Sequence, residues 1–197
     1  MNINREEILQ KLRLQVKASR FKHCLGVEKA AQELAERFGY ERPEVAALAG
    51  LLHDYAKEQD QSEYFRLIDQ YGLDSELKKW NSSVWHGYVG WLKVKEDFPE
   101  IAEEYPEILR AIEIHTVGSG LMTMLDKIVY VADYIEENRD FDGVEKARKI
   151  ANQSLDAAVA YETAHTVEFL AHKQVPIFPQ TIETYNAYIS ALEDIKK

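Results

Sequence analysis

The sequence predicts an all-α fold, and three observations favour this class. Apolar residues recur with a period of about 3.6 over long stretches, which is the spacing of one face of an α-helix. The 197 residues include nine glycines and five prolines, and their positions fit the ends of helices. Hydrophobic residues make up 46% of the chain, enough to bury one sizeable core without disulfides. We therefore expect one helical domain that spans residues 1–197.

The first helices follow from their end signals. A capping box at Asn4–Glu7 starts a helical pattern that is interrupted near Ser19 and ends at Gly39, a residue suited to the position after a helix. Pro43 then opens the next helix at a favourable first-turn position. The residues from 45 to 52 are almost all apolar, so this helix is expected to be buried on every side.

The rest of the chain carries the same kinds of signal. Two prolines in the segment Val175–Pro179 predict an extended connection, because proline does not continue a helix. A looser segment is expected at 73–81. Helices are expected over residues 62–72, 83–97, 106–115 and 121–137, over a pair of stretches between 144 and 173, and from Thr181 onward.

Charge and cysteine content exclude several classes of protein. A net charge of -10 opposes general binding to nucleic acid or to an anionic membrane, because phosphate contacts supply most of that affinity. A phosphate ligand still fits where a metal and a few cationic side chains hold it locally. Cys24 is the single cysteine, so a reducing cytoplasm fits best. Arg5, Glu6 and Lys11 interrupt the apolar positions of the N-terminal segment, which is unlike a signal peptide.

The dipeptide His53-Asp54 follows directly on the apolar helix and is expected to be buried with it. A buried carboxylate costs several kcal/mol of desolvation unless a cation or good hydrogen bonds compensate it. A divalent metal satisfies an imidazole and a carboxylate together. The pair therefore indicates a metal site.

Further histidines and one aspartate recur along the chain at separations of about one helix and its connection. Each lies near one predicted helix, so the side chains can project into a common cavity. The set comprises His23, His53-Asp54, His86, His115 and Asp133.

The order of these residues resembles the HD superfamily of metal-dependent phosphohydrolases, which is defined by a histidine, a His-Asp pair and a later aspartate. Here these are His23, His53-Asp54 and Asp133. Within the superfamily, the chain is similar to the bacterial YqeK-type family of symmetrical bis(5'-nucleosyl)-tetraphosphatases. The matching motifs follow in order at residues 53–57, 85–87, 114–116, 126–136 and 138–140, with His172-Lys173 and the loop at Pro176.

The resemblance implies a single HD-type helical bundle that cleaves diadenosine tetraphosphate (Ap4A) symmetrically into two ADP on an iron-type or other transition-metal centre. Mixed imidazole and carboxylate ligands suit Fe, Mn, Co, Ni or Zn better than Mg or Ca. Iron is the first choice, and one ion is favoured over two. The expected metal ligands are His23, His53, Asp54 and Asp133.

A bound metal would lower the pKa of a water molecule and polarise a phosphoryl oxygen, so that an inner phosphorus is attacked. The expected catalytic residues are Asp54, Lys57, His86 and His115. His86 and His115 either bind a second ion or contact phosphate and protonate the leaving nucleotide, and we favour the phosphate contacts. The expected substrate-binding residues are Arg20, Lys57, His86, His115, Thr116, Asp133, Arg139, His172 and Lys173.

Two other classes of function remain open at this point. One is another HD phosphohydrolase activity, on guanosine polyphosphates, deoxynucleotides or a nucleoside monophosphate. The other is a nucleotide sensor or ribosome-associated factor that keeps the pocket without turnover. A homodimer is plausible. Asp126 is expected to pair with a neighbouring lysine or to cap a loop more readily than to act in the site.

Overall fold

The computed structural model describes residues 4–194, and the regular secondary structure in this range is helical, which confirms the all-α class. No helix in the range is both long enough and apolar enough to cross a membrane. The helices are α1 (Arg5–Gln15), α2 (Ala18–Arg37), α3 (Pro43–Leu52), α4 (Gln61–Gln70), the 3-10 helix η1 (Ser75–Lys79), α5 (Ser82–Tyr88), α6 (Trp91–Asp97), α7 (Pro99–Glu104), α8 (Pro106–Ile114), α9 (Met124–Ile135), α10 (Val144–Ala151), α11 (Leu155–His172), α12 (Pro179–Tyr188) and α13 (Ala191–Asp194).

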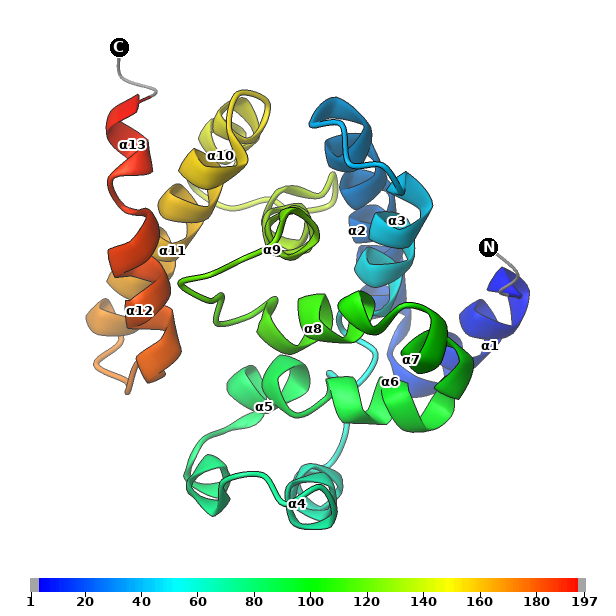
Figure 1. Cartoon of the computed structure of the whole chain (residues 1–197). Helices are drawn as coiled ribbons and strands as arrows, with labels where there is room; N and C mark the ends of the chain where they lie inside the picture. The colour runs from blue at the N-terminus through cyan, green and yellow to red at the C-terminus, as the bar shows by residue number, and fades with distance from the viewer. Residues whose placement is uncertain (1–3, 195–197) are drawn as a thin grey trace.

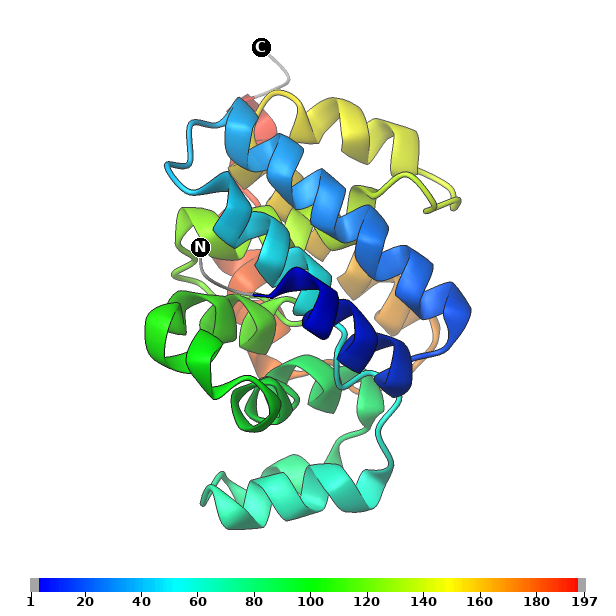
Figure 2. The ribbon, with the colours of Figure 1, turned by 90° about the vertical axis from the view of Figure 1, so that its right-hand side faces the viewer.

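Helix α9 lies at the centre of the bundle. It packs against α2 and α3 on one side, against α10 and α11 on the other, and against α8 (Figure 1). A quarter turn of the molecule shows α2 running along one face and α4 lying at one end, away from α10 (Figure 2). The main apolar cluster includes residues of α2, α3, α8, α9 and α11. The central helix therefore carries its side chains toward most of the bundle.

Helix α3 is buried along its length, as its composition predicts. All eight residues from Val45 to Leu52 are buried. Gly50 permits the close approach of α2, because a Cβ atom at this position would lie 2.8 Å from the Val27 carbonyl oxygen and 3.1 Å from the Ala31 Cβ. The helix ends at Leu52, so His53 and Asp54 lie in the turn just beyond it rather than in its last turn.

The turn at 53–58 is anchored in two different apolar clusters. Tyr55 belongs to the main cluster, and its hydroxyl donates to Asp97 Oδ2 at 2.7 Å. Ala56 belongs to a second cluster, and its carbonyl accepts from the Tyr64 hydroxyl. The second cluster comprises Ala56, Tyr64, Leu67, Ile68, Leu77, Trp85, Val89 and Leu92. Packing on both sides holds His53 and Asp54 in place without a helix.

The prediction of one continuous helix over 83–97 is wrong, because the structure divides this segment into α5 and α6 at Gly90. A Cβ atom on Gly90 would lie 2.0 Å from the His86 carbonyl oxygen and 2.7 Å from the Ala56 Cβ. The bend therefore needs glycine. The first break also lies at Val16 and Lys17 rather than near Ser19.

Asp126 has the capping role expected for it. It forms a reciprocal capping box with Thr123 at the start of α9, and its Oδ2 accepts from Arg110 Nε at 3.0 Å. We expect Asp126→Ala to lower the free energy of unfolding by about 2 to 3 kcal/mol, because the cap is lost and Arg110 loses its buried partner. Urea unfolding measures this, with the exposed Asp142→Ala as control. Equal midpoints for the two variants would contradict the assignment.

Candidate metal centre

The structure brings together six of the side chains expected at the site. His23 comes from α2, His86 from α5 and Asp133 from α9, while His53-Asp54 and His115 directly follow α3 and α8. The Nε2 atoms of His23 and His53 lie 3.2 Å apart, and those of His86 and His115 lie 3.1 Å apart. Asp133 Oδ1 is 3.0 Å from His23 Nε2. Five of the six residues are buried, and Asp133 is half-buried.

The Nδ1 atom of each histidine already has a partner, which leaves Nε2 to face the centre. His53 Nδ1 donates to the Gly50 carbonyl at 2.7 Å, His86 Nδ1 to the Ser82 carbonyl at 2.8 Å, and His115 Nδ1 to the Ile112 carbonyl at 2.7 Å. These acceptors lie three or four residues earlier, in the helix that contains or directly precedes the histidine. The hydrogen bonds assign the proton to Nδ1 and the free lone pair to Nε2.

Asp54 lies between the two histidine pairs and presents one oxygen to each. Its Oδ2 lies 3.3 Å from His53 Nε2 and 3.7 Å from His23 Nε2. Its Oδ1 lies 3.3 Å from His86 Nε2 and 3.6 Å from His115 Nε2. This buried Oδ1 has no hydrogen-bond partner among residues 4–194. Two groups, His23-His53-Asp133 and His53-Asp54-His115, each bring their ligand atoms within 4.8 Å of one another.

The donor set fits a transition metal. With the protons on Nδ1, the lone pairs of neighbouring Nε2 atoms face one another at about hydrogen-bond distance with no proton between them. A buried arrangement of this kind is unfavourable without a cation. Imidazole nitrogen with carboxylate oxygen is the ligand combination that Fe, Mn, Co, Ni and Zn accept.

Three cationic side chains surround the centre and remain partly exposed. Arg20 Nη1 donates to Asp54 Oδ2 at 2.7 Å, and Lys57 Nζ lies 2.9 Å from His86 Nε2. Arg139 pairs with the Asp133 carboxylate and donates from Nε to the Asp133 carbonyl at 2.8 Å. Their side chains are about one third exposed, at 28%, 29% and 33%. A local positive rim therefore exists on a chain of net charge -10.

The protonation of the centre follows from burial and from these neighbours. Burial raises the pKa of Asp54, but the surrounding imidazoles outweigh it and hold the pKa well below its ordinary value. Burial and the charge of Lys57 hold the pKa of His86 well below its usual range. Burial also lowers the pKa of Lys57. The centre therefore offers an ionised carboxylate and a neutral imidazole at neutral pH.

The remaining predicted substrate contacts divide into two groups. Thr116 lies at the site, with Oγ1 3.0 Å from His86 Nε2 and 3.1 Å from His115 Nε2. His172 and Lys173 lie at the C-terminal end of α11, exposed and outside the cluster, and the Lys173 ammonium lies over the Phe169 ring. Their nucleotide contact stays a prediction.

Two buried carboxylates near the centre have no sequence signal that reveals their role. Glu136 hydrogen-bonds to His23 Nδ1, from a position far along the chain. Glu162 on α11 is 7% exposed, and its Oε2 has no partner in the described structure. Burial and the charge of Asp133 raise the pKa of Glu162 well above its ordinary value.

Glu162 predicts a pH dependence of stability. Because its folded pKa is raised, the folded protein keeps a proton that the unfolded chain releases above about pH 4.3, so the free energy of unfolding falls as pH rises through neutrality. Glu162→Gln keeps the shape without the titration. In metal-free protein we expect this variant to gain stability over the wild type between about pH 5.5 and about pH 8 by urea unfolding. Glu168→Gln, on the exposed face of α11, should show no such gain. A pH-independent difference at Glu162 would reject this explanation.

The order of the clustered residues has a counterpart in known families. A sequence model described as the HD domain matches residues 20–138, which include every member of the cluster. The chain belongs to the HD domain family. This confirms the resemblance drawn from the sequence, and HD-family membership supports a divalent metal at the cluster.

Relatives within the HD family match nearly the whole chain. A protein of Bacillus subtilis (strain 168) named "Bis(5'-nucleosyl)-tetraphosphatase, symmetrical" is 40% identical over 188 residues, covering 95% of this chain and 99% of the relative. A protein of the same name from Staphylococcus aureus (strain NCTC 8325 / PS 47) is 36% identical over 198 residues, covering 100% and 99%.

A solved structure agrees with the HD fold. The crystal structure described as a predicted HD superfamily hydrolase involved in NAD metabolism from Clostridium acetobutylicum superposes with a TM-score of 0.84. Its sequence is 33% identical, and the match covers 96% of this chain and 98% of that one.

Proposed function

We propose that the chain is a metal-dependent symmetrical bis(5'-nucleosyl)-tetraphosphatase that cleaves Ap4A into two molecules of ADP. The observation that carries the proposal is the convergence of four Nε2 atoms and two carboxylates beneath a rim of three cations. The names of full-length relatives at 36% to 40% identity support the substrate.

We place the metal between His23, His53, Asp54 and Asp133, whose ligand atoms lie close together and are already oriented. When bound there, a divalent metal polarises a phosphoryl oxygen and lowers the pKa of a water molecule. Iron is our first choice, with Mn, Co, Ni or Zn as alternatives. The protein supplies the fixed geometry, because each ligand histidine is held by a hydrogen bond at Nδ1.

His86 and His115 are assigned to the substrate rather than to a second ion. The Lys57 ammonium lies 2.9 Å from His86 Nε2 and 3.8 Å from Asp54 Oδ1, near the position that a second ion between these groups would need. A cation of the chain itself therefore stands there, which favours one ion. Lys57 can then donate to a phosphate oxygen or return a proton to the leaving ADP, and His86, whose Nε2 lone pair faces the ammonium at 2.9 Å, positions it. Asp54 completes the catalytic set that we propose.

The polyphosphate is proposed to lie along the cationic rim. Arg20 and Arg139 supply planar donors suited to phosphate oxygens, and the Thr116 hydroxyl adds a further donor. Both arginines are already held by Asp54 and Asp133, so their orientation is fixed before substrate arrives. Asp133 contributes to this substrate site through Arg139. His172 and Lys173 are retained as candidate nucleotide contacts.

Product identification tests the proposal. Protein loaded with Fe²⁺ or Mn²⁺ is incubated with Ap4A, and the products are separated by anion-exchange chromatography. ADP as the sole product supports symmetrical cleavage, whereas AMP with ATP would mean asymmetric attack. Guanosine polyphosphates, deoxynucleotides, nucleoside monophosphates and NAD serve as competing substrates. Tight Ap4A binding without product under every metal would favour the nucleotide sensor.

Three further expectations belong with this proposal. We propose that residues 1–197 form one domain, that the enzyme works in the cytoplasm, and that it forms a homodimer. The buried, unpaired Cys24 is compatible with a reducing compartment. The negative net charge agrees with a small nucleotide substrate rather than a nucleic acid or an anionic membrane.

A further inference from the structure

Glu136 is the cap residue at the end of α9 and is 2% exposed. Its Oε1 lies 3.0 Å from Nδ1 of His23. Its Oε2 accepts two hydrogen bonds from Asn138, from the backbone nitrogen at 2.7 Å and from Nδ2 at 2.8 Å. The carboxylate therefore accepts hydrogen bonds on both oxygens.

We propose that Glu136 is a positioning residue that fixes the ring and the tautomer of His23, so that Nε2 faces the metal. An ionised carboxylate only accepts hydrogen bonds, so the nitrogen that faces it must carry the proton. The proton is then on Nδ1, and the Nε2 lone pair is left for the ion. Both Asn138 donors point at Oε2, which fits a carboxylate that carries no proton.

The other three histidines of the cluster use a nearby backbone carbonyl for the same purpose. His23 lies within the longest helix, α2, and its Nδ1 faces another element instead of a carbonyl of its own helix. Glu136 supplies the acceptor from α9, the helix that also carries Asp133.

The chain makes room for this contact at Gly26, which lies on the same face of α2 as His23, three residues later. A Cβ atom at Gly26 would lie 2.1 Å from Glu136 Oε2 and 3.0 Å from Asn138 Nδ2. Any side chain would displace the carboxylate. The contact that orients His23 therefore requires glycine at position 26.

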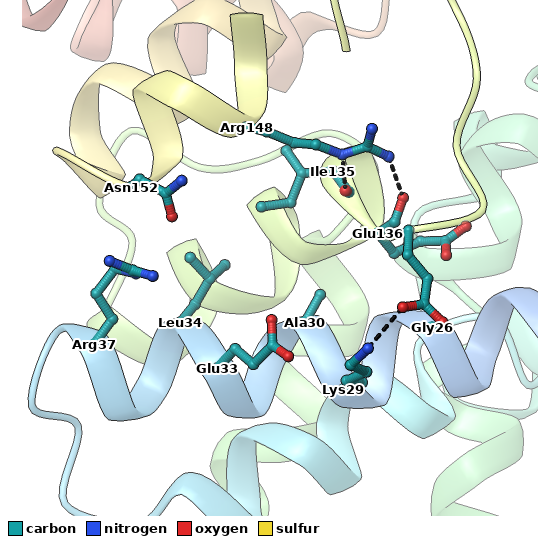
Figure 3. Close-up of a pocket in the computed structure, with 11 residues that line it drawn as sticks. Gly26, Lys29, Ala30, Glu33, Leu34, Arg37, Ile135, Glu136, Arg148 and Asn152 are labelled. Carbon is teal, nitrogen blue, oxygen red and sulfur yellow. Dashed lines mark hydrogen bonds and ion pairs between the residues drawn. The ribbon is translucent and has the colours of Figure 1, made fainter. Parts of the chain in front are cut away.

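Arg148 of α10 fixes the segment that carries Glu136. It donates to the carbonyl oxygens of Ile135, Glu136 and Arg139 at 2.9, 2.8 and 3.0 Å. Figure 3 shows this arginine reaching the end of α9, with Gly26 on the facing helix. Both residues line a cavity of about 230 Å³. The end of α9 therefore has few alternative positions.

Glutamine cannot replace Glu136 in this arrangement. If the amide oxygen faces the Asn138 donors, the amide nitrogen donates to His23 Nδ1 and drives the proton onto Nε2, where it blocks the metal. If the oxygen faces His23 instead, the amide nitrogen opposes the two Asn138 donors. The first orientation reverses the hydrogen bond to His23, and the second loses the hydrogen bonds from Asn138. We therefore expect Glu136→Gln to weaken metal binding by about 10- to 100-fold.

The experiment is a Co²⁺ titration of the metal-free full-length protein against a competing chelator, with the visible absorption of bound Co²⁺ as a second readout. Glu137→Gln is the matched control, since it removes the same charge from the next residue, which is exposed and pairs with Lys29. Gly26→Ala keeps every ligand and Glu136 itself, and alanine favours the helix. We expect Glu136→Gln and Gly26→Ala to weaken binding and change the spectrum, and the double variant to be no weaker than Glu136→Gln alone.

Wild-type affinity and spectrum in a folded Glu136→Gln or Gly26→Ala would overturn the inference. Should Glu136→Gln fail to fold, Gly26→Ala alone decides. The inference rests on the metal ligands proposed above, so His23→Ala is measured in the same titration, and unchanged Co²⁺ affinity there would overturn both. If the variants show the expected Co²⁺ affinities but the wild type forms no ADP from Ap4A, the proposed substrate is rejected and the role of Glu136 remains supported.

Discussion

Replacing Asp54 with asparagine is expected to abolish tight metal binding and to lower kcat/KM for Ap4A at least about a thousandfold, since the bound metal contributes several kcal/mol and each 1.36 kcal/mol is tenfold. Asp54 is the carboxylate that lies against both histidine pairs, and it is 1% exposed. Asparagine preserves the volume and can still accept from Arg20, so the helical fold should persist. Metal analysis of the purified variant, circular dichroism and product assays measure the three effects.

A surface substitution provides the control for this change. Asp69→Asn removes the same charge from an exposed pair with Lys78 and should leave metal content and turnover unchanged. An Asp54→Asn enzyme with normal turnover would remove Asp54 from the metal site. Loss of metal together with loss of helical signal would instead assign it a structural role.

Replacing Lys57 with alanine is expected to lower kcat/KM by about a hundredfold while metal remains bound. Its ammonium lies against His86 and Asp54 Oδ1 at the cationic rim, and it is not among the proposed ligands. Removing it takes away a donor to the phosphate and the positive charge that stabilises a leaving ADP. Steady-state kinetics with matched metal analysis measure the effect.

Lys78→Ala is the matched control, because it removes a lysine that is exposed to a similar extent, 30%, and that pairs with Asp69 outside the site. We expect its kinetics to equal the wild type. If Lys57→Ala lost metal in proportion to activity, the lysine would support the ligands rather than the substrate. An unchanged kcat/KM would reject its proposed contact with phosphate.

Local signals explain which parts of the fold could be predicted. Gly39 follows α2 with a φ of +71°, a conformation that glycine adopts without strain, so the helix end was visible in the sequence. The apolar run before His53 also predicts a buried helix from local sequence, because a segment without polar residues has no face suited to solvent. The break at Gly90 is not predicted, because one of the two close approaches that exclude a side chain there is to Ala56, far earlier in the sequence.

The order of the metal-type residues could be predicted, but their orientation could not. His23, His53, Asp54 and Asp133 follow a recognisable order, and helix lengths suggest that they meet. The partner of His23, however, is Glu136, at a sequence separation of 113 residues, and no local pattern links the two. Lys57 lies three residues after Asp54, and the contact between the two forms through a turn beyond the helix.

The division of the core into two apolar clusters affects how the protein loses activity as it unfolds. His53 is held beside the main cluster, with His23 and Asp133, whereas Lys57 and His86 adjoin the second cluster through Ala56 and Trp85. Local opening of the second cluster would therefore release Lys57 and His86 while the ion stays in place. Warming should produce a population of metal-loaded, inactive molecules before global melting. Substitutions in one apolar cluster should affect the stability of that cluster more than the stability of the other.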